Sequence, residues 1–434
     1  MTRFKLLVLA LLCVSDFSLH AHAQQSAASS LAGRWDAVIT NASKIDVPFG
    51  LSIREDRRAS GGFRAEILNG SESIPFTTAT LVNGELKLHL EQYDGTLKVH
   101  FEGNELRGEW SRQTATGVVH YPVRATRHQQ RKGTDAAWEG NSLNGQWTFT
   151  FDGSATNPDK VAPAEFKQSK ALAEAGEVVA EVEGTIAPVS GDYGLLAGTV
   201  SASRNNPATF RLSRFDGIHI VLVTGEFKLD GSLAGKLNTQ AFTAIPRTAA
   251  ASTASAAAAE PDPESVTKLN DPSETFRFSA IDPKTRRRVT QDDPRFKGKP
   301  YIVDIFGTWC PNCHDEAPVL VDIYKRYREQ GLEIVGLAYE YVDDRARNAR
   351  LIEVYRKKYR IAFPLLLAGT TDEGQIAKTL PQLVGFGAYP TTIFVGRDGK
   401  VHKIHAGFAG PATGERFTET KKRFEENVKA IVAR

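Results

Sequence analysis

Apolar and polar residues alternate along most of the first half of the chain. Residues 86–90 and 97–101 place every second side chain on one face, which is the period of a half-buried strand. Asn83-Gly84 and Asp94-Gly95 lie between such runs, and these dipeptides are strong hairpin signals. The pattern therefore predicts antiparallel β structure over residues 31–245.

The same short sequence marks occur twice in this half, in the same order. They are Gly-x-Trp at 33–35 and 145–147, aromatic-Asp-Gly at 93–95 and 215–217, and Leu-x-Gly at 106–108 and 233–235. This similarity predicts two repeats, residues 31–128 and 143–246, each long enough for a small barrel or sandwich. Gly-x-Trp on a first strand also resembles the opening of lipocalin-like barrels, and Trp35 and Trp147 are interpreted as plugs at the bottom of a β core.

The pattern changes in the second half of the chain. Residues 247–265 are rich in alanine and proline, cannot bury much surface, and are interpreted as an interdomain linker. Over residues 266–434, short apolar runs alternate with segments of helical spacing. This alternation predicts parallel strand pairing in a layered α/β domain. We expect strands at 301–306, 332–339 and 391–395, and helices at 311–327, 346–359 and 415–433.

The N-terminus is typical of a secretory signal. Arg3 and Lys5 precede an apolar run over residues 6–14, and Ala21-His22-Ala23 has the small-x-small pattern of a cleavage site. Residues 1–23 are therefore predicted to be a signal peptide, and the mature chain is expected in the periplasm.

Two other readings of this segment are weaker. The apolar run is much shorter than the ~20 residues that span a bilayer, which disfavours an uncleaved anchor. A lipoprotein signal would use Cys13, but the bulky Leu12 before it fits that processing site badly. No later segment is apolar enough to cross a membrane, so we expect no transmembrane segment after cleavage.

Composition describes a soluble globular protein of several domains, with 41% hydrophobic and 24% charged residues in 434. The net charge of +3 is nearly balanced and gives no reason to propose nucleic acid as a partner. Removal of the signal peptide leaves two cysteines, Cys310 and Cys313. A structural disulfide framework would use more cysteines spread along the chain, so this pair indicates chemistry.

The Cys pair lies where a predicted buried strand gives way to a predicted helix. The free N–H groups and partial positive charge of a helix N-terminus favour the thiolate form of Cys310. Cys313 lies one turn into the helix, close enough to attack a mixed disulfide formed at Cys310. The spacing therefore assigns Cys310 as nucleophile and Cys313 as the resolving cysteine.

Residues 303–313 resemble the active-site strand and loop of thioredoxins, and residues 314–318 are similar to the TlpA/ResA-like branch of exported thioredoxin-like proteins. The resemblance covers about residues 273–434. It implies that Asp304 is the buried acid that shuttles a proton to the resolving cysteine and that Glu316 lies in the active-site cavity. The alternatives are an edge-exposed Asp304 and a solvated Glu316.

Ala388-Tyr389-Pro390-Thr391-Thr392 resembles the family's cis-proline loop. The resemblance implies that Pro390 is cis and faces the disulfide, and that the backbone of Tyr389 is offered to a bound substrate chain. Trp309, directly before the Cys pair, is expected to pack against the sulfurs and shield them. These three residues are the candidate substrate-binding set.

Metal and cofactor sites were weighed against this interpretation. A zinc site would need a second Cys pair, which the chain lacks. Cys310-Pro311-Asn312-Cys313-His314 also matches the C-x-x-C-H pattern of haem attachment, but the mature chain has no Met as axial ligand. A bis-His haem stays open as an alternative. We expect neither metal nor cofactor, and we expect His314 to be a surface residue in the first helical turn.

The predicted function is dithiol–disulfide exchange with protein partners in the cell envelope. Family members commonly act as reductants there, which implies an upstream electron donor, although the sequence leaves the direction open. A second hypothesis makes the β repeats the main part, binding a ligand or partner beside an accessory redox-sensing domain. A peroxidase would need a Thr and a Cys in a Pro-led motif that the chain does not show.

Overall fold

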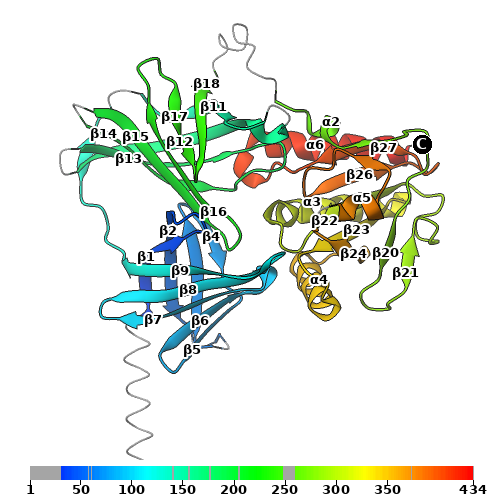
Figure 1. Cartoon of the computed structure of the whole chain (residues 1–434), viewed down its shortest axis with the longest axis horizontal. Coiled ribbons are helices and arrows are strands. Elements are labelled where there is room, and N and C mark those ends of the chain that lie inside the picture. The colour runs from blue at the N-terminus through cyan, green and yellow to red at the C-terminus, as the bar shows by residue number, and fades with distance from the viewer. Residues whose placement is uncertain are drawn as a thin grey trace, which may run out of the picture.

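The computed structural model describes residues 31–433 apart from 57, 60, 139–140, 155–156, 175–176, 204–205, 248–259 and 373. The predicted signal peptide and most of the predicted linker lie outside the described residues. Two β-rich repeats stand beside a C-terminal α/β domain (Figure 1). Within the described part of the chain, no helix has the length and apolar character needed to span a membrane.

The first repeat is one antiparallel sheet of nine strands in the order β4-β3-β2-β1-β9-β8-β7-β6-β5. The turn between β5 and β6 is the predicted Asn83-Gly84, and both residues have positive φ, as a two-residue hairpin of this type requires. The sheet curls into a half-barrel. Its strands are β1 (Gly33–Thr40), β2 (Asp46–Glu55), β3 (Phe63–Asn69), β4 (Glu72–Pro75), β5 (Thr78–Val82), β6 (Glu85–Leu90), β7 (Gly95–Glu102), β8 (Glu105–Thr114) and β9 (Gly117–Arg127), with a 3-10 turn η1 (Glu91–Tyr93) before β7.

The second repeat closes into a barrel, because β12 pairs with both β11 and β13. Aromatic side chains fill its interior, among them Trp147, Phe149, Phe166 and Phe242, all buried. Its strands are β11 (Gly145–Phe151), β12 (Val161–Glu174), β13 (Glu177–Ile186), β14 (Leu196–Ser203), β15 (Asn206–Phe215), β16 (Ile220–Phe227), β17 (Leu233–Leu237) and β18 (Gln240–Pro246), with the short β10 (Thr134–Ala136) added beside β12.

Both repeats begin in the same way. Trp35 Nε1 donates to the Leu31 carbonyl at 3.0 Å, and Trp147 Nε1 donates to the Leu143 carbonyl at 2.9 Å. Both indoles are buried in their β cores, as expected for plugs. The predicted fold class, two antiparallel β repeats followed by an α/β domain, is confirmed.

The C-terminal domain holds a seven-stranded sheet in the order β21-β20-β24-β23-β22-β26-β27. The predicted helices and strands are all present within one or two residues. The strands are β20 (Ser279–Ile281), β21 (Arg288–Thr290), β22 (Tyr301–Phe306), β23 (Glu333–Glu340), β24 (Leu365–Thr370), β26 (Thr391–Val395) and β27 (Val401–Ala406); β19 (Lys268–Leu269) and β25 (Leu383–Val384) pair separately; the helices are α2 (Pro263–Val266), α3 (Pro311–Tyr327), α4 (Arg345–Tyr359), α5 (Gln375–Thr379) and α6 (Glu415–Val432).

The parallel pairing expected from strand–helix alternation holds for β22–β23 and β23–β24, but it is wrong for β26, which runs antiparallel to β22. The described residues between β24 and β26 form only two short elements, α5 and β25, and no long crossover helix of the kind that joins parallel strands. The chain therefore enters β26 at the edge where β24 ends.

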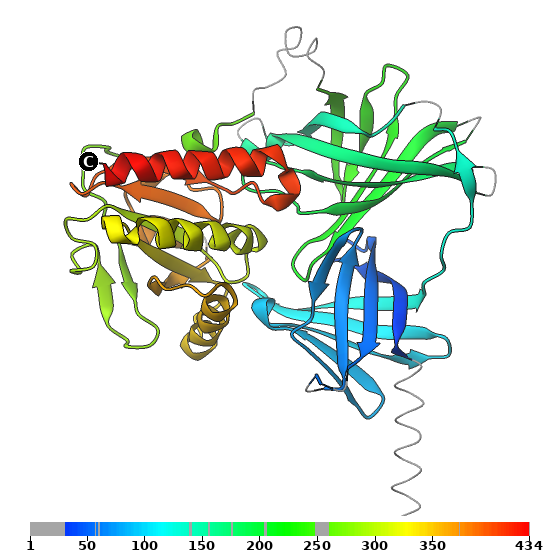
Figure 2. The same cartoon turned by 180° about the vertical axis from the view of Figure 1, so that it is seen from behind.

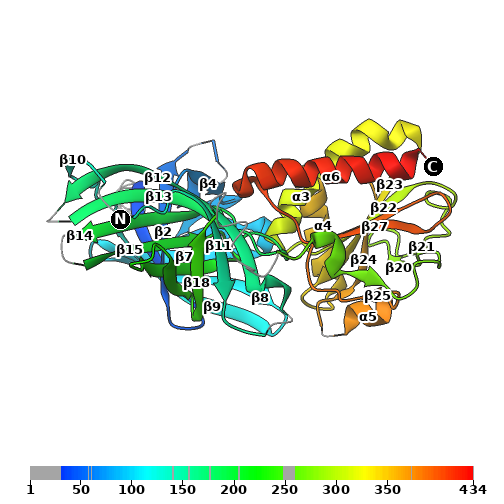
Figure 3. The same ribbon diagram turned by 90° about the horizontal axis from the view of Figure 1, so that it is seen from above.

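Helices cover one face of this sheet. Buried side chains of α3, α4 and α6, such as Leu320, Ile352 and Phe424, form one core with Phe306 and Phe394. The α3 and α6 helices run side by side on this face (Figures 2 and 3). A second core around Phe278 and Phe296 covers the other face. The sheet is thus buried on both sides, which accounts for the fully buried pattern of β22.

The two repeats pack against each other through a shared core residue. Phe215, from β15 of the second repeat, is fully buried in the core of the first, with its ring 4.7 Å from Phe49 and 5.4 Å from Trp110. Asn69 fixes the same residue from β3: its side chain donates to the Phe215 carbonyl at 2.9 Å and accepts from the Phe215 N–H at 3.0 Å.

The first repeat also contacts the C-terminal domain. Asp94, which follows η1, accepts hydrogen bonds from Arg347 at 3.0 Å and Arg350 at 2.6 Å, both on α4. The ring of Tyr93 packs edge-on against His314 of α3 at 5.1 Å. The three units therefore meet around the first turn of α3, where the Cys pair lies.

Candidate active site

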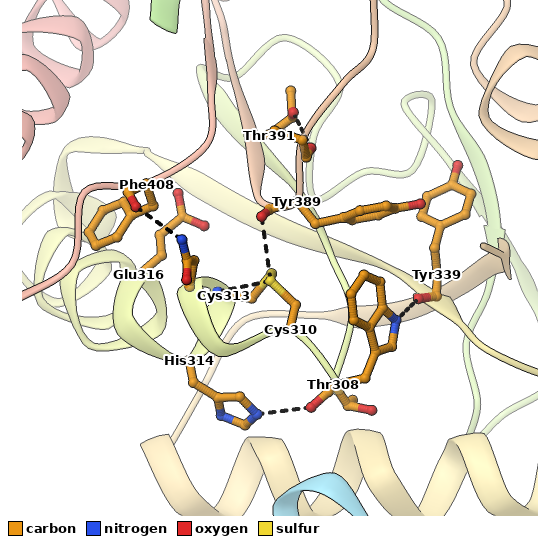
Figure 4. Close-up of a disulfide and its surroundings, with 12 residues drawn as sticks. Thr308, Cys310, Cys313, His314, Glu316, Tyr339, Tyr389, Thr391 and Phe408 are labelled. Atoms are coloured by element: carbon orange, nitrogen blue, oxygen red, sulfur yellow. Dashed lines mark hydrogen bonds between the residues drawn. A yellow bond between two sulfur atoms is a disulfide. The ribbon is translucent and has the colours of Figure 1, made fainter. Parts of the chain in front are cut away.

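The Cys pair is held by the start of a helix. Cys310 is the N-cap of α3, and its Sγ accepts the backbone N–H of Cys313 at 3.1 Å. The two sulfurs form a disulfide across Cα atoms 5.3 Å apart (Figure 4). Both cysteines are buried, Cys310 at 3% and Cys313 at 1% exposure, and Cys310 lines the cleft that opens beside the disulfide.

The cis-proline loop faces the disulfide. The Tyr389–Pro390 peptide bond is cis, and the Tyr389 carbonyl oxygen lies 3.5 Å from Cys310 Sγ. Trp309 donates from Nε1 to the Tyr339 carbonyl at 2.9 Å and packs edge-on against the Tyr389 ring at 5.2 Å. Residues 80 positions apart in sequence are thus brought together, and Trp309 and Tyr389 line the cleft beside Cys310.

The carboxyls of Asp304 on β22 and Glu316 on α3 interact with each other, and Glu316 lies one helical turn after Cys313. Both are buried, at 3% and 1% exposure, and Thr392 Oγ1 donates to Glu316 Oε1. Burial raises the pKa of both carboxyls, and the nearby Asp304 charge raises the pKa of Glu316 further. Two adjoining carboxyls in a dry site keep a shared proton near neutral pH, because two unscreened negative charges would repel each other.

His314 is not the surface residue that its place in the first helical turn suggested. It is 6% exposed, because Tyr93 of the first repeat and Tyr355 of α4 pack against its ring. Its Nε2 donates to the Thr308 carbonyl at 2.9 Å, so Nδ1 accepts the Tyr359 hydroxyl proton at 2.8 Å. Burial lowers the pKa of His314, and both ring nitrogens are held by protein groups, so the ring is not oriented as a haem ligand.

A third buried acid of the site, Glu340 at the end of β23, was missed in the sequence. Its carboxyl accepts from the Thr308 backbone N–H at 3.0 Å and from Thr308 Oγ1 at 2.8 Å. Burial raises the pKa of Glu340 to about 7. The signal was available, since Glu340 directly follows the apolar run 332–339. Its contacts show that it positions the loop that leads to Trp309 and Cys310.

A cleft of about 460 Å³ opens beside the disulfide. One wall comes from the C-terminal domain and the other from two loops of the second repeat, residues 187–195 and 216–219. Its lining comprises Pro188, Ser190, Gly191, Asp192, Tyr193, Ile218, His219, Trp309, Cys310, Pro311, Asn312, Phe386, Gly387, Ala388 and Tyr389. The contribution of the second repeat to this site could not be found from the Cys motif.

Part of the C-terminal half of the chain is similar to known proteins. Residues 277–404 match the AhpC/TSA family. The chain is 31% identical over 136 residues to thiol-disulfide oxidoreductase ResA of Bacillus thuringiensis subsp. konkukian and 26% identical over 136 residues to ResA of Geobacillus thermodenitrificans. In each case the match covers 31% of this chain and 65% of the relative, just under two thirds of its length.

Among solved structures, a thioredoxin-family thiol:disulfide interchange protein from Chlorobium tepidum is 24% identical, with a TM-score of 0.29, over 38% of this chain and 99% of that one. The family match falls on the region that carries the Cys pair, the buried acids and the cis-proline loop. Residues 277–404 are therefore similar to the AhpC/TSA family, and the chain is also similar to ResA-type thiol–disulfide oxidoreductases.

Proposed function

We propose that this chain exchanges disulfides with partner proteins of the cell envelope and acts there as a reductant. The observation that carries the proposal is the position of Cys310 Sγ: it lies at the N-terminus of α3 and 3.5 Å from the carbonyl of the cis-proline loop. A helix N-terminus favours a thiolate there. The loop backbone beside it suits an extended substrate chain.

The reaction has two exchange steps. In the reduced protein, the Cys310 thiolate attacks one sulfur of a substrate disulfide, forming a mixed disulfide and releasing the other substrate sulfur as a thiolate, which takes a proton from water. The Cys313 thiolate then attacks Cys310 Sγ, which releases the second substrate thiolate and closes the Cys310–Cys313 disulfide. Two electrons pass from the protein dithiol to the substrate.

Asp304 and Glu316 supply the proton acceptor for the second step. Cys313 is buried, so its thiol proton cannot pass directly to bulk water. Glu316 lies one helical turn after Cys313 and pairs with Asp304, and burial raises the pKa of both carboxyls, to about 7 for Asp304. We assign Asp304 and Glu316 as a proton-transfer pair for Cys313. Trp309, Tyr389 and Pro390 bind the substrate segment.

The envelope location and the direction rest on sequence. The signal-like N-terminus and the resemblance to an exported branch support location, and reduction in an oxidising compartment needs an upstream dithiol donor that reopens the Cys310–Cys313 disulfide. The redox potential of the full chain, measured by equilibration with a thiol–disulfide buffer, tests the direction. A potential above that of ordinary structural disulfides by a wide margin would indicate an oxidant and overturn the reductant role.

The activity is tested with two cysteine variants of the full chain. Cys310→Ser removes the nucleophile and should abolish reduction of a peptide disulfide. Cys313→Ser should instead accumulate a mixed disulfide between Cys310 and the peptide, detected by mass under non-reducing conditions. Exchange that persists in Cys310→Ser would refute the assignment.

A further inference from the structure

We propose that the second repeat forms one wall of the substrate cleft and restricts the substrate to an extended peptide segment with an apolar residue beside its cysteine. This inference rests on the proposed disulfide exchange at Cys310 and specifies which protein segments that exchange accepts.

The loop of residues 187–195, between β13 and β14, is docked on the start of α3. The side-chain amide of Asn312, with its nitrogen directed at the Asp192 carbonyl, donates there at 3.2 Å and accepts from the Asp192 N–H at 2.9 Å. The Asp192 carboxyl accepts the Gly410 N–H at 2.6 Å. These bonds tie one loop of the barrel to both the Cys motif and the segment after β27.

Two glycines show how close the approach is. A Cβ added at Gly191 would lie 1.6 Å from the Asn312 side chain, and one added at Gly407 would lie 2.0 Å from the Val189 carbonyl. Both glycines also have positive φ, which other residues rarely adopt. One glycine comes from each side of the contact, so the two surfaces are fitted to each other and the loop is a fixed part of the site.

This docking leaves a cleft of limited volume beside the sulfur. Cys310 is 3% exposed at the floor of the 460 Å³ cleft, between Trp309 and Tyr389 on one side and Tyr193 and Ile218 on the other. A stable contact between two folded surfaces needs about 800 Å² on each partner. The cleft has instead the size of a pocket for a ligand of a few residues. An extended strand can reach Cys310, whereas a folded surface meets the barrel loops first.

The residues that line the cleft disfavour a charged residue in the bound substrate segment. Its walls are mostly aromatic and aliphatic, and the described residues that line it include no Lys or Arg. The Asp and His side chains that the barrel contributes already have partners: Asp192 accepts from Gly194 N–H at 2.7 Å and from Gly410, and His219 Nδ1 lies 2.8 Å from Asp216. A charged residue beside the substrate cysteine would lose water without gaining a partner. An apolar one would be buried against Ile218, Tyr193 and Phe386.

The test uses the reduced full chain and three synthetic peptides that differ only in the residues flanking one cysteine: Leu, Glu or Lys. Each cysteine carries a small aromatic thiol as a mixed disulfide, so attack by Cys310 releases a chromophore. We expect kcat/KM for the Leu peptide to exceed that for the Glu peptide at least about tenfold. A folded protein with a surface disulfide should react more slowly than the same protein unfolded.

Ile218→Glu should remove the preference for Leu over Glu and favour the Lys peptide. Leu229→Glu is the matched control, because Leu229 belongs to the same barrel but is fully exposed in the turn before β17, and it should keep the preference of the unaltered chain. The peptide series on the unaltered chain decides the proposal even if Ile218→Glu does not fold.

The outcomes separate the two proposals. Equal rates for the three peptides, or equal rates for folded and unfolded protein, would overturn the barrel's role in selection and leave disulfide exchange intact. Absence of reaction with all three peptides and with both the folded and the unfolded protein would refute the exchange itself.

Discussion

Glu340 offers the sharpest test of the electrostatics below the active-site loop. Its ordinary pKa is 4.5, and burial raises it to about 7 in the fold. Because the folded value lies above the unfolded one, the fold favours the protonated carboxyl. The stabilising contribution of protonation is therefore fully present below pH 4.5 and is lost as pH rises through 7.

The size of this effect follows from the two pKa values. Each pKa unit corresponds to about 1.4 kcal/mol, so holding Glu340 ionised in the fold costs about 3 kcal/mol above pH 7. In Glu340→Gln the amide oxygen can still accept from the Thr308 N–H and the amide nitrogen can donate to Thr308 Oγ1. The variant copies the protonated acid but cannot ionise.

We expect Glu340→Gln to match the unaltered chain in unfolding free energy near pH 4.5 and to exceed it by about 3 kcal/mol near pH 8. Urea unfolding followed by far-ultraviolet circular dichroism measures this, because the long helices of the described chain, α3, α4 and α6, all lie in the C-terminal domain. Asp322→Asn, which alters an exposed carboxylate on α3, is the control and should show no such trend. A difference that stays constant with pH, or shrinks as pH rises, would refute the reasoning.

Three further outcomes are expected. Phe215→Ala should lower the unfolding free energy of the β region by about 3–5 kcal/mol, because it leaves a cavity at a fully buried site between the repeats. Calorimetry of the full chain measures this loss, and Leu229→Ala, at an exposed position, is the control. Asp304→Asn should slow the release of substrate from the mixed disulfide at least about a hundredfold in stopped-flow assays. In the unaltered chain the rate of this step should rise as pH rises toward neutral, because burial raises the pKa of Asp304. A pH-independent rate would contradict the proton-transfer role. Asp94→Asn should lower the unfolding free energy by about 1 kcal/mol near pH 7 and not at all in strong acid. Burial opposes ionisation of Asp94, but the hydrogen bond from Arg350 and the charges of Arg350 and Arg347 outweigh it and lower the pKa of Asp94, so the ion pair stabilises the fold above pH 3.8 and is lost as pH falls below that value. Equal hydrogen exchange of α4 in both proteins at pH 7 would contradict this prediction.

Much of the secondary structure could be predicted from the sequence because each element carries its own periodicity. The helix over 311–327 begins directly after its N-cap at Cys310 and ends within the expected residues. The cis bond at Pro390 followed from a local motif. The direction of strand pairing was harder to predict: β26 runs antiparallel to β22, and no residue pattern within β26 itself indicates that direction.

The candidate site was only half visible in the sequence. Cys310, Cys313 and the cis-proline loop are marked by motifs, whereas the barrel wall depends on contacts such as Asp192 with Asn312, which are 120 residues apart and have no shared pattern. His314 was expected at the surface because an isolated helix would expose it. Its burial by Tyr93 depends on how the repeats dock, and docking is decided by three units together.

The core of the first repeat is completed by an aromatic side chain, Phe215, that belongs to the second repeat. Phe49 and Trp110 are made long before Phe215, the side chain that packs between them. During synthesis or export, the half-barrel therefore exists for about a hundred residues with an unfilled apolar socket. Its folding must wait for a segment that belongs to its neighbour, so the two repeats reach their native state as one cooperative unit, and a chain cut between them would leave the first half prone to self-association.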